Sequence, residues 1–197
     1  LPIFMRKLLR HFPALLAVAL LFGCAQAPTA PAPAAATADI KPEFTIREIM
    51  KSMVEPRADT LWNAVTTSVT DKGVETHAPK TEEEWAKMRY EAVTLSEAMN
   101  SIQMAGRKVA KPGEQAKDPK VELTFEQIDA LINKDRAAWA KFAHTLQEKV
   151  GAAIKAIDAK NVDGLSAAGG DIDAACESCH KMYWYPNDKG APEPEKK

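Results

Sequence analysis

The chain has 197 residues, of which 46% are apolar and 27% are charged, and its formal net charge is −1. This length allows one ordinary domain with appendages. The balanced charge gives no support for binding to nucleic acid, which we exclude as a partner class.

The first 24 residues predict a signal peptide, which places the protein in the periplasm. Positive side chains at residues 6–10 precede an apolar run at 15–22, which is too short for a comfortable transmembrane helix. The run ends in Leu21-Phe22-Gly23-Cys24, which resembles the lipobox of bacterial lipoproteins. In that family the cysteine becomes the lipidated first residue, so the resemblance implies a membrane anchor on Cys24. Ordinary cleavage after Ala25-Gln26-Ala27 and an uncleaved anchor are the alternatives.

Three further regions follow from composition. Residues 25–40 are almost entirely Ala, Pro and Thr, which predicts a semi-extended tether. Residues 41–186 contain four segments of helical periodicity and no convincing strand, so they predict the folded domain. Residues 187–197 form a charged tail.

The first helical segment begins at the capping-box pattern Thr45 to Glu48. Apolar residues then recur at spacings of three and four. Pro56 lies inside this run and predicts a kink or a short break, because proline removes a helical hydrogen bond. Residues 67–80 predict a loop or tight turn.

Two more capping boxes, Thr81 to Glu84 and Thr124 to Gln127, open the second and third segments. The third segment carries one apolar stripe from Phe125 to Ile157, which predicts a single long helix. Residues 105–123, rich in Gly, Pro and Lys, predict a long solvated connection before it. The fourth segment runs from Leu165 to Tyr183, and Gly169 and Gly170 within it suggest either a closely packed neighbour or a locally weak helix.

Four amphipathic helices of this kind predict an all-α, antiparallel four-helix bundle. Such bundles hold cofactors between facing helices. If the helices pack antiparallel, a group attached near the end of the fourth helix lies against the first.

The fourth segment contains Cys176-Glu177-Ser178-Cys179-His180, the attachment signature of c-type haem. Positions i, i+3 and i+4 share one helix face, so Cys176, Cys179 and His180 can meet one side of a flat macrocycle. A redox-active dithiol and half of a zinc site are the alternatives. A zinc site needs about four ligands, and the sequence offers no second pair.

With this motif near its C-terminus, the chain resembles a class II cytochrome c, the cytochrome c′ group. The resemblance covers about residues 40–186 and implies one covalent haem c, bound through Cys176 and Cys179, with His180 as the proximal iron ligand. The family's distal position on the first helix falls on Met50 within Ile49-Met50-Lys51, which implies Met50 as the sixth ligand. Met53 is the second choice, and ordinary core packing is the alternative for either methionine.

The resulting functional prediction is a periplasmic monohaem cytochrome, not an enzyme, that carries single electrons through a His/Met-ligated iron. The expected partners are redox proteins of a respiratory chain, a membrane through the lipid anchor, and optionally a second copy in a homodimer. The first alternative is a five-coordinate haem protein that binds NO or CO. The second is a haem-free helical lipoprotein whose Cys176 and Cys179 form a dithiol or a metal site.

Overall fold

The structure is a computed structural model that describes residues 41–188. The predicted signal peptide with Cys24, the tether up to residue 40 and the tail from residue 189 lie outside the described residues. The elements are α1 (Ile46–Ile49), η1 (Met50–Val54), α2 (Glu55–Trp62), β1 (Thr66–Thr70), β2 (Gly73–His77), α3 (Glu82–Ile102), α4 (Phe125–Lys134), α5 (Arg136–Asp158) and α6 (Val162–Tyr183).

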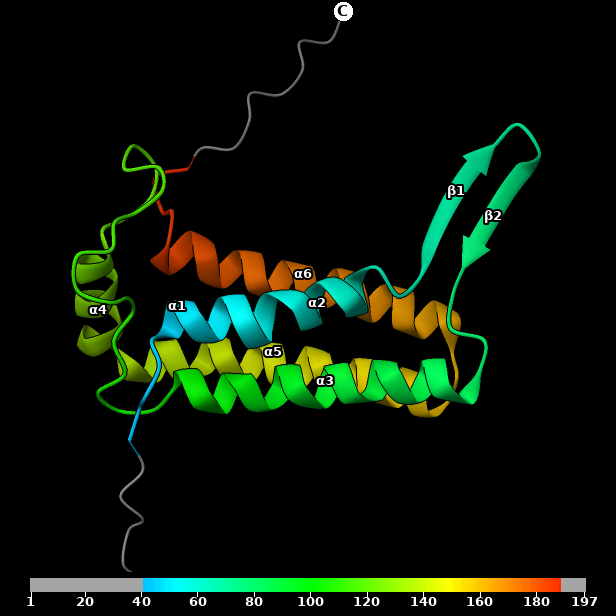
Figure 1. The fold of residues 1–197 in the computed structure, drawn as a ribbon, viewed down its shortest axis with the longest axis horizontal. Coiled ribbons are helices and arrows are strands. Elements are labelled where there is room, and N and C mark those ends of the chain that lie inside the picture. The colour runs from blue at the N-terminus through cyan, green and yellow to red at the C-terminus, as the bar shows by residue number, and fades with distance from the viewer. Residues whose placement is uncertain (1–40, 189–197) are drawn as a thin grey trace, which may run out of the picture. The chain divides into compact units, whose positions relative to one another are not determined.

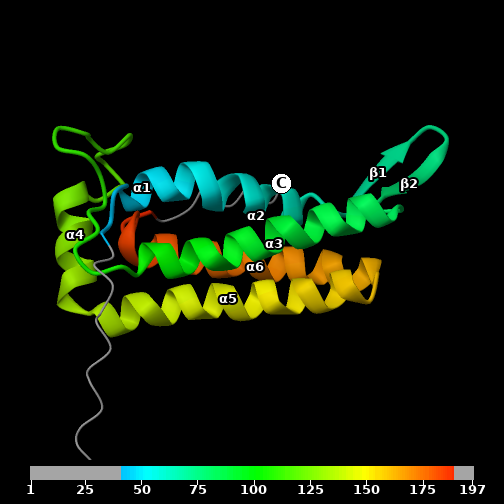
Figure 2. The same cartoon turned by 60° about the horizontal axis from the view of Figure 1, so that its bottom comes forward.

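The prediction of an antiparallel four-helix bundle is confirmed (Figure 1). Segments α1, η1 and α2 run on without a break and together form the first rod of the bundle, which we call helix 1. Helix 1, α3, α5 and α6 run alternately up and down, and helix 1 lies beside α6 in both views (Figure 2). Among the described residues, no helix is long and apolar enough to cross a membrane.

The three predicted capping boxes are all present. The Thr45 hydroxyl accepts a hydrogen bond from the Glu48 N–H at 3.1 Å, and the Thr45 N–H donates to the Glu48 carboxylate at 3.0 Å. The boxes at Thr81 and Thr124 have the same reciprocal pattern. Each box satisfies helix N–H groups that have no partner within the helix, so these starts are fixed locally.

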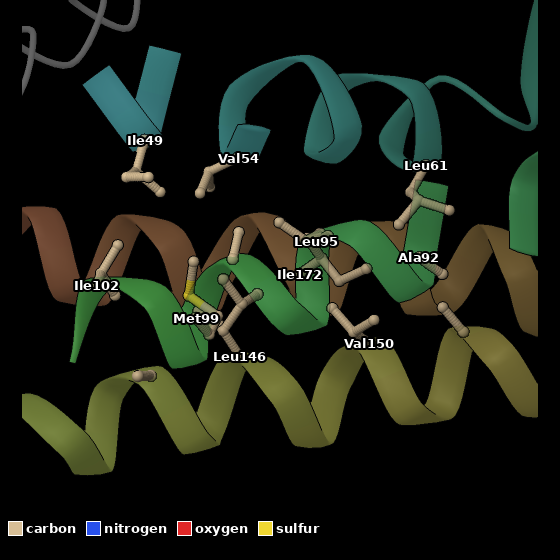
Figure 3. Packing of buried hydrophobic residues seen from close by; sticks show 14 of the residues in the cluster. Ile49, Val54, Leu61, Ala92, Leu95, Met99, Ile102, Leu146, Val150 and Ile172 are labelled. Carbon is tan, nitrogen blue, oxygen red and sulfur yellow. The ribbon is translucent and has the colours of Figure 1, made fainter. Parts of the chain in front are cut away.

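The apolar stripes of the four rods meet in one core (Figure 3). Its members include side chains with 2% exposure or less from every rod. These are Ile46, Leu61, Ala92, Leu95, Ala98, Met99, Val150, Ala153, Ile157, Leu165 and Ile172.

The interruption predicted at Pro56 takes the form of a π-helical turn, η1, and not of a break. The helix continues through Pro56, which occupies the first turn of α2. In a regular α-helix, proline clashes with the carbonyl four residues before it and cannot donate to that carbonyl. In the π-turn the hydrogen bonds reach five residues back, which gives Pro56 more room.

The predicted loop at residues 67–80 is instead largely a β-hairpin. Strands β1 and β2 pair antiparallel with Val69 opposite Val74, and Gly73 (φ +123°) closes the turn. The β-branched residues favour extended backbone, and Asp71-Lys72-Gly73 supplies the turn chemistry. All ten strand residues are exposed, so no buried face was available to give a clear period-2 signal.

The third predicted segment is two helices rather than one. Asp135 leaves the helical region (φ −141°, ψ 79°), and its carboxylate accepts a hydrogen bond from the Ala138 N–H at 2.8 Å, which caps α5. As a result α4 lies across one end of the bundle (Figure 1). The apolar stripe continues through the break because both helices contact the core, which hid the boundary in the sequence.

The sequence predicted a solvated connection between α3 and α4, but part of this connection is buried. Val109 is fully buried, and Arg107 is buried at 8% exposure. The N–H groups of Ile46 and Arg47 donate to the carbonyls of Lys108 and Val109 at 2.8 and 2.9 Å. The connection therefore satisfies the first N–H groups of helix 1 and holds its N-terminal end against the bundle.

Candidate functional site

The three residues of the Cys-x-x-Cys-His motif lie on the last turns of α6. All are partly buried. Cys176 and His180 line a cavity of about 470 Å³ whose walls come mainly from helix 1 and α6. With Cys179 they also line an adjoining cavity of about 40 Å³ that reaches α3 and α5. The motif thus faces helix 1, as antiparallel packing required.

Met50 lines both cavities together with His180, whereas Met53 lines neither. Both methionines are partly buried and pack against the core. Of the two methionines, Met50 therefore lies at the cavity that His180 lines.

The larger cavity has the size and lining expected of a cofactor site. Its volume lies within the range of about 300–1,000 Å³ typical of small-molecule and cofactor sites. Val54, Ala58, Phe125, Ile172 and Trp184 supply apolar lining. The two thiols, the imidazole and these walls fit a flat apolar group attached to α6.

Burial suppresses the acidity of both thiols. It raises the pKa of Cys176 to about 11, with the nearby Asp173 carboxylate adding to the effect. Burial likewise raises the pKa of Cys179 to about 12. Redox-active cysteines need a lowered pKa so that the thiolate is present, and this site does the opposite.

Burial lowers the pKa of His180, although the carboxylates of Glu177 and Glu55 oppose the shift. The imidazole is therefore neutral at pH 7, the form in which a ring nitrogen can bind a metal. The Tyr185 hydroxyl donates to the Glu177 carboxylate at 2.5 Å, and this contact lowers the pKa of Glu177. The Tyr185 ring lies 5.9 Å from that of His180.

The end of α6 is closed by the segment that follows it. The N–H groups of Trp184 and Tyr185 both donate to the His180 carbonyl, at 2.7 and 3.0 Å. The Trp184 carbonyl accepts from the Leu123 N–H at 2.8 Å, and its ring packs 5.7 Å from Phe125. The residues before α4 therefore form one end wall of the cavity.

Charges in the cavity are segregated along helix 1. Arg47 and Lys51 come first, and Glu55 and Asp59 follow one to three turns later. Arg47 pairs with Glu114 at 2.8 Å. Along helix 1 the basic lining residues therefore precede the acidic ones, while Lys117 and Glu122 line the cavity from the connection before α4.

Several lining residues carried no functional signal in the sequence. Lys117 and Glu122 belong to the connection before α4 and reach the cavity only through the fold. Trp184 and Tyr185 could have been identified, because they follow the motif directly and a helix end there returns them to His180.

Three aromatic residues of the bundle, Trp85, Trp139 and Tyr183, are buried. The Trp139 and Tyr183 rings meet edge to face at 5.0 Å. Trp62 differs, since it is 52% exposed and lines the larger cavity. It belongs to the rim of the site rather than to the core.

Neither a scan against protein-family models nor a search of curated proteins found a match. Solved structures of cytochromes c′ are similar. One, titled cytochrome c′, is 20% identical with a TM-score of 0.43 and covers 71% of this chain and 88% of its own. A variant of the Alcaligenes xylosoxidans protein with bound carbon monoxide is 20% identical (TM-score 0.44; 74% and 97% covered). A ferrous variant with bound NO is 22% identical (TM-score 0.46; 74% and 96% covered).

These structures belong to the group that the sequence resembles. Their TM-scores lie below 0.5, so what this chain binds has to be inferred from its own residues.

Proposed function

We propose that the chain is a monohaem c-type cytochrome that carries single electrons. The observation that carries the proposal is that Cys176, His180 and Met50 line one cavity between two antiparallel helices. The motif on α6 is an attachment signature, and the cavity has room for the attached group.

When bound, a c-type haem supplies an iron that changes between ferrous and ferric states. Cys176 and Cys179 would hold the macrocycle through thioether bonds, and the neutral imidazole of His180 would be one iron ligand. Met50 of helix 1 would be the other. A His/Met ligand pair raises the reduction potential relative to other axial pairs.

The order of charges along helix 1 supports the proposal. Arg47 and Lys51 would attract acidic groups on the edge of a macrocycle, whereas Glu55 and Asp59 would repel them. The apolar walls exclude water, which favours the less charged ferrous state.

A five-coordinate iron that binds NO or CO is the second candidate. The smaller cavity of about 40 Å³ favours it, since Met99, Ile102 and Leu146 line it together with Met50 and His180. Its volume exceeds the roughly 10–15 Å³ that a water molecule needs, so a diatomic ligand has room. In this candidate Met50 is a wall of the cavity and not a ligand.

A haem-free dithiol or metal site is less well supported. Both thiols have raised pKa values, which opposes thiolate chemistry. Across residues 41–188, no group of three or more His, Cys, Asp and Glu side chains is arranged to hold a metal ion.

The deciding experiment is the visible spectrum of the purified protein, ferric and dithionite-reduced, with and without CO. Sharp ferrous α and β bands that CO leaves unchanged are expected for His/Met ligation. A broad high-spin spectrum that shifts with CO would establish the second candidate. The absence of a Soret band, in protein made with an active haem-attachment pathway, would refute the haem itself.

Met50→Ala identifies the ligand, and Met53→Ala is the matched control on the same helix. The first is expected to convert the spectrum to the high-spin, CO-binding form. The second is expected to lower stability only, since Met53 packs against the core. If Met53→Ala converted the spectrum instead, the assignment would move to Met53.

The proposal includes a periplasmic location, since covalent haem attachment takes place outside the inner membrane. It also includes a lipid anchor on Cys24, a redox partner protein, and no enzymatic turnover. Mass spectrometry of the mature N-terminus tests the anchor: a diacylglyceryl-modified Cys24 supports it, and an unmodified start after Ala27 replaces it with a freely soluble form.

A further inference from the structure

Helix 1 contains one residue more than a regular α-helix needs, and the extra residue lies beside the cavity. In η1 the Glu55 N–H donates to the carbonyl of Met50, five residues back rather than four. Such π-turns are rare and occur frequently at functional sites. Met50 is the first residue of this one.

The apolar pattern of helix 1 contains the same insertion. The stripe before the turn consists of Ile46, Ile49, Met50 and Met53, and the stripe after it of Val54, Ala58, Leu61 and Val65. The first stripe follows the helical-face pattern i, i+3, i+4, i+7, and the second has steps of four, three and four. Met53 and Val54 are adjacent, however, so the two stripes are offset by one residue. One residue is about 100° around an α-helix. In the structure Ile49 and Val54 nevertheless both point into the bundle (Figure 3).

Pro56 disfavours the regular register at this point. It has no N–H to donate to the carbonyl of Ser52, and in an α-helix its ring would clash with that carbonyl. The Ser52 carbonyl instead has the Arg57 guanidinium at 3.5 Å. The Ser52 hydroxyl donates to the Glu48 carbonyl at 2.6 Å, a contact that often bends helices.

The N-terminal end of helix 1 is held independently. Its first N–H groups bind the carbonyls of Lys108 and Val109, and Ile46 is almost fully buried. A change of register in η1 therefore has to be absorbed between this fixed end and the packed residues Val54 and Leu61.

We infer that Pro56 is a positioning residue that holds η1 in the π-register and thereby directs Met50 into the cavity. In a regular helix the residues before the turn would rotate by about 100° relative to Val54 and Leu61. That rotation takes Met50 away from the cavity. The inference rests on the proposed function, because the iron reports on where Met50 lies.

The test compares the holoproteins of the wild type, Pro56→Ala and Pro112→Ala. Pro112 lies exposed in the connection before α4 and is the matched proline control. Pro56→Ala is expected to show a several-fold larger CO-binding, high-spin fraction and a lower reduction potential. Pro112→Ala is expected to match the wild type in both. A loss of stability alone would change the melting temperature without changing the spin state.

A second variant removes the offset by deleting Ser52 in the Pro56→Ala background. The two stripes then follow one regular spacing, so an α-helix can place both on the bundle and Met50 in the cavity. Recovery of the low-spin spectrum is expected. If Pro56→Ala kept the wild-type spectrum and potential, or if the deletion gave no recovery, the inference would be wrong. If Pro56→Ala yielded no holoprotein, the spectrum of the deletion variant would decide.

A wild type that is itself high-spin would refute ligation by Met50 without refuting the register. The register is then read from crystal structures of the wild type and Pro56→Ala. The Glu55 N–H is expected to bond five residues back in the wild type and four residues back in the variant. The same bond in both proteins would overturn the inference.

Discussion

Gly169 of α6 lies directly against the backbone of Leu61 in α2. A Cβ on Gly169 would be 3.3 Å from the Leu61 carbonyl oxygen, whereas a Cβ on Gly170 would have nothing within 4 Å. The close approach of these two helices, which form the main walls of the cavity, therefore depends on one glycine of the pair. Of the two explanations that the sequence left open, close packing applies to Gly169 and not to Gly170.

The two glycines are expected to respond in opposite ways to substitution. Gly169→Val forces a branched side chain against helix backbone and should destabilise the protein by about 1–3 kcal/mol. Gly170→Ala meets no neighbour and should stabilise it by about 0.5–1 kcal/mol, since alanine favours the helix. Denaturant unfolding of both holoproteins measures the difference. Equal destabilisation by both would contradict the close-approach explanation.

Arg107 is expected to matter for the position of helix 1. Its guanidinium donates to the Ser101 carbonyl at 2.8 Å and to the Phe44 carbonyl. Arg107→Met keeps the length of the side chain but leaves both carbonyls without this donor, which should cost about 1–3 kcal/mol. Lys108→Met, on an exposed neighbour, is the control and should stay within about 0.5 kcal/mol. Urea unfolding measures the free energy of unfolding of both variants. Equal losses in the two would contradict the anchoring role of Arg107.

The Glu48 carboxylate should make the stability of the protein depend on pH in the acidic range. Its hydrogen bond with Lys111, followed by that with the Thr45 N–H, lowers its pKa from 4.5 to about 2. A group with a lowered pKa stabilises the fold above its ordinary pKa, and that contribution is lost as the pH falls through the folded value. The melting temperature of Glu48→Gln should therefore lie below that of the wild type at neutral pH, and the gap should shrink between pH 4.5 and 2.

The exposed Glu83 of α3 provides the control for this pH dependence. Glu83→Gln should give a melting curve that follows the wild type across the same range. A Glu48→Gln gap that stayed constant from neutral pH to below pH 2 would show that the carboxylate charge contributes nothing, and that only the capping geometry is lost.

Asp135 is expected to hold the boundary between α4 and α5. Its carboxylate caps α5 through the Ala138 N–H, so Asp135→Ala should cost about 1 kcal/mol. Asp135→Asn retains an acceptor oxygen and should cost a few tenths at most. Chemical unfolding monitored by circular dichroism measures both. If alanine and asparagine cost the same, the cap does not explain the break in the helix.

The sequence by itself determined the features that depend on local contacts. The capping boxes at Thr45, Thr81 and Thr124 satisfy their own N–H groups within four residues, so their positions could be predicted to the residue. The end of the fourth helix at Tyr183 and the one-sided spacing of Cys176, Cys179 and His180 are also local properties. The bundle itself followed because four apolar stripes leave few ways to bury them.

Only the tertiary structure decided the features that depend on distant partners. The resemblance placed Met50 before Met53, but only the structure shows that Met50 lines the cavity with His180 and that Met53 does not. The cavity's end wall needs Phe125 against Trp184, and the buried connection needs Val109 against the start of helix 1. The hairpin was not predicted because its strands are exposed and therefore carry no apolar pattern. The break at Asp135 was not predicted because buried apolar residues continue on both sides of it. Local hydrogen bonds fix where helices begin and end, whereas the packing between helices fixes which side chains face the site.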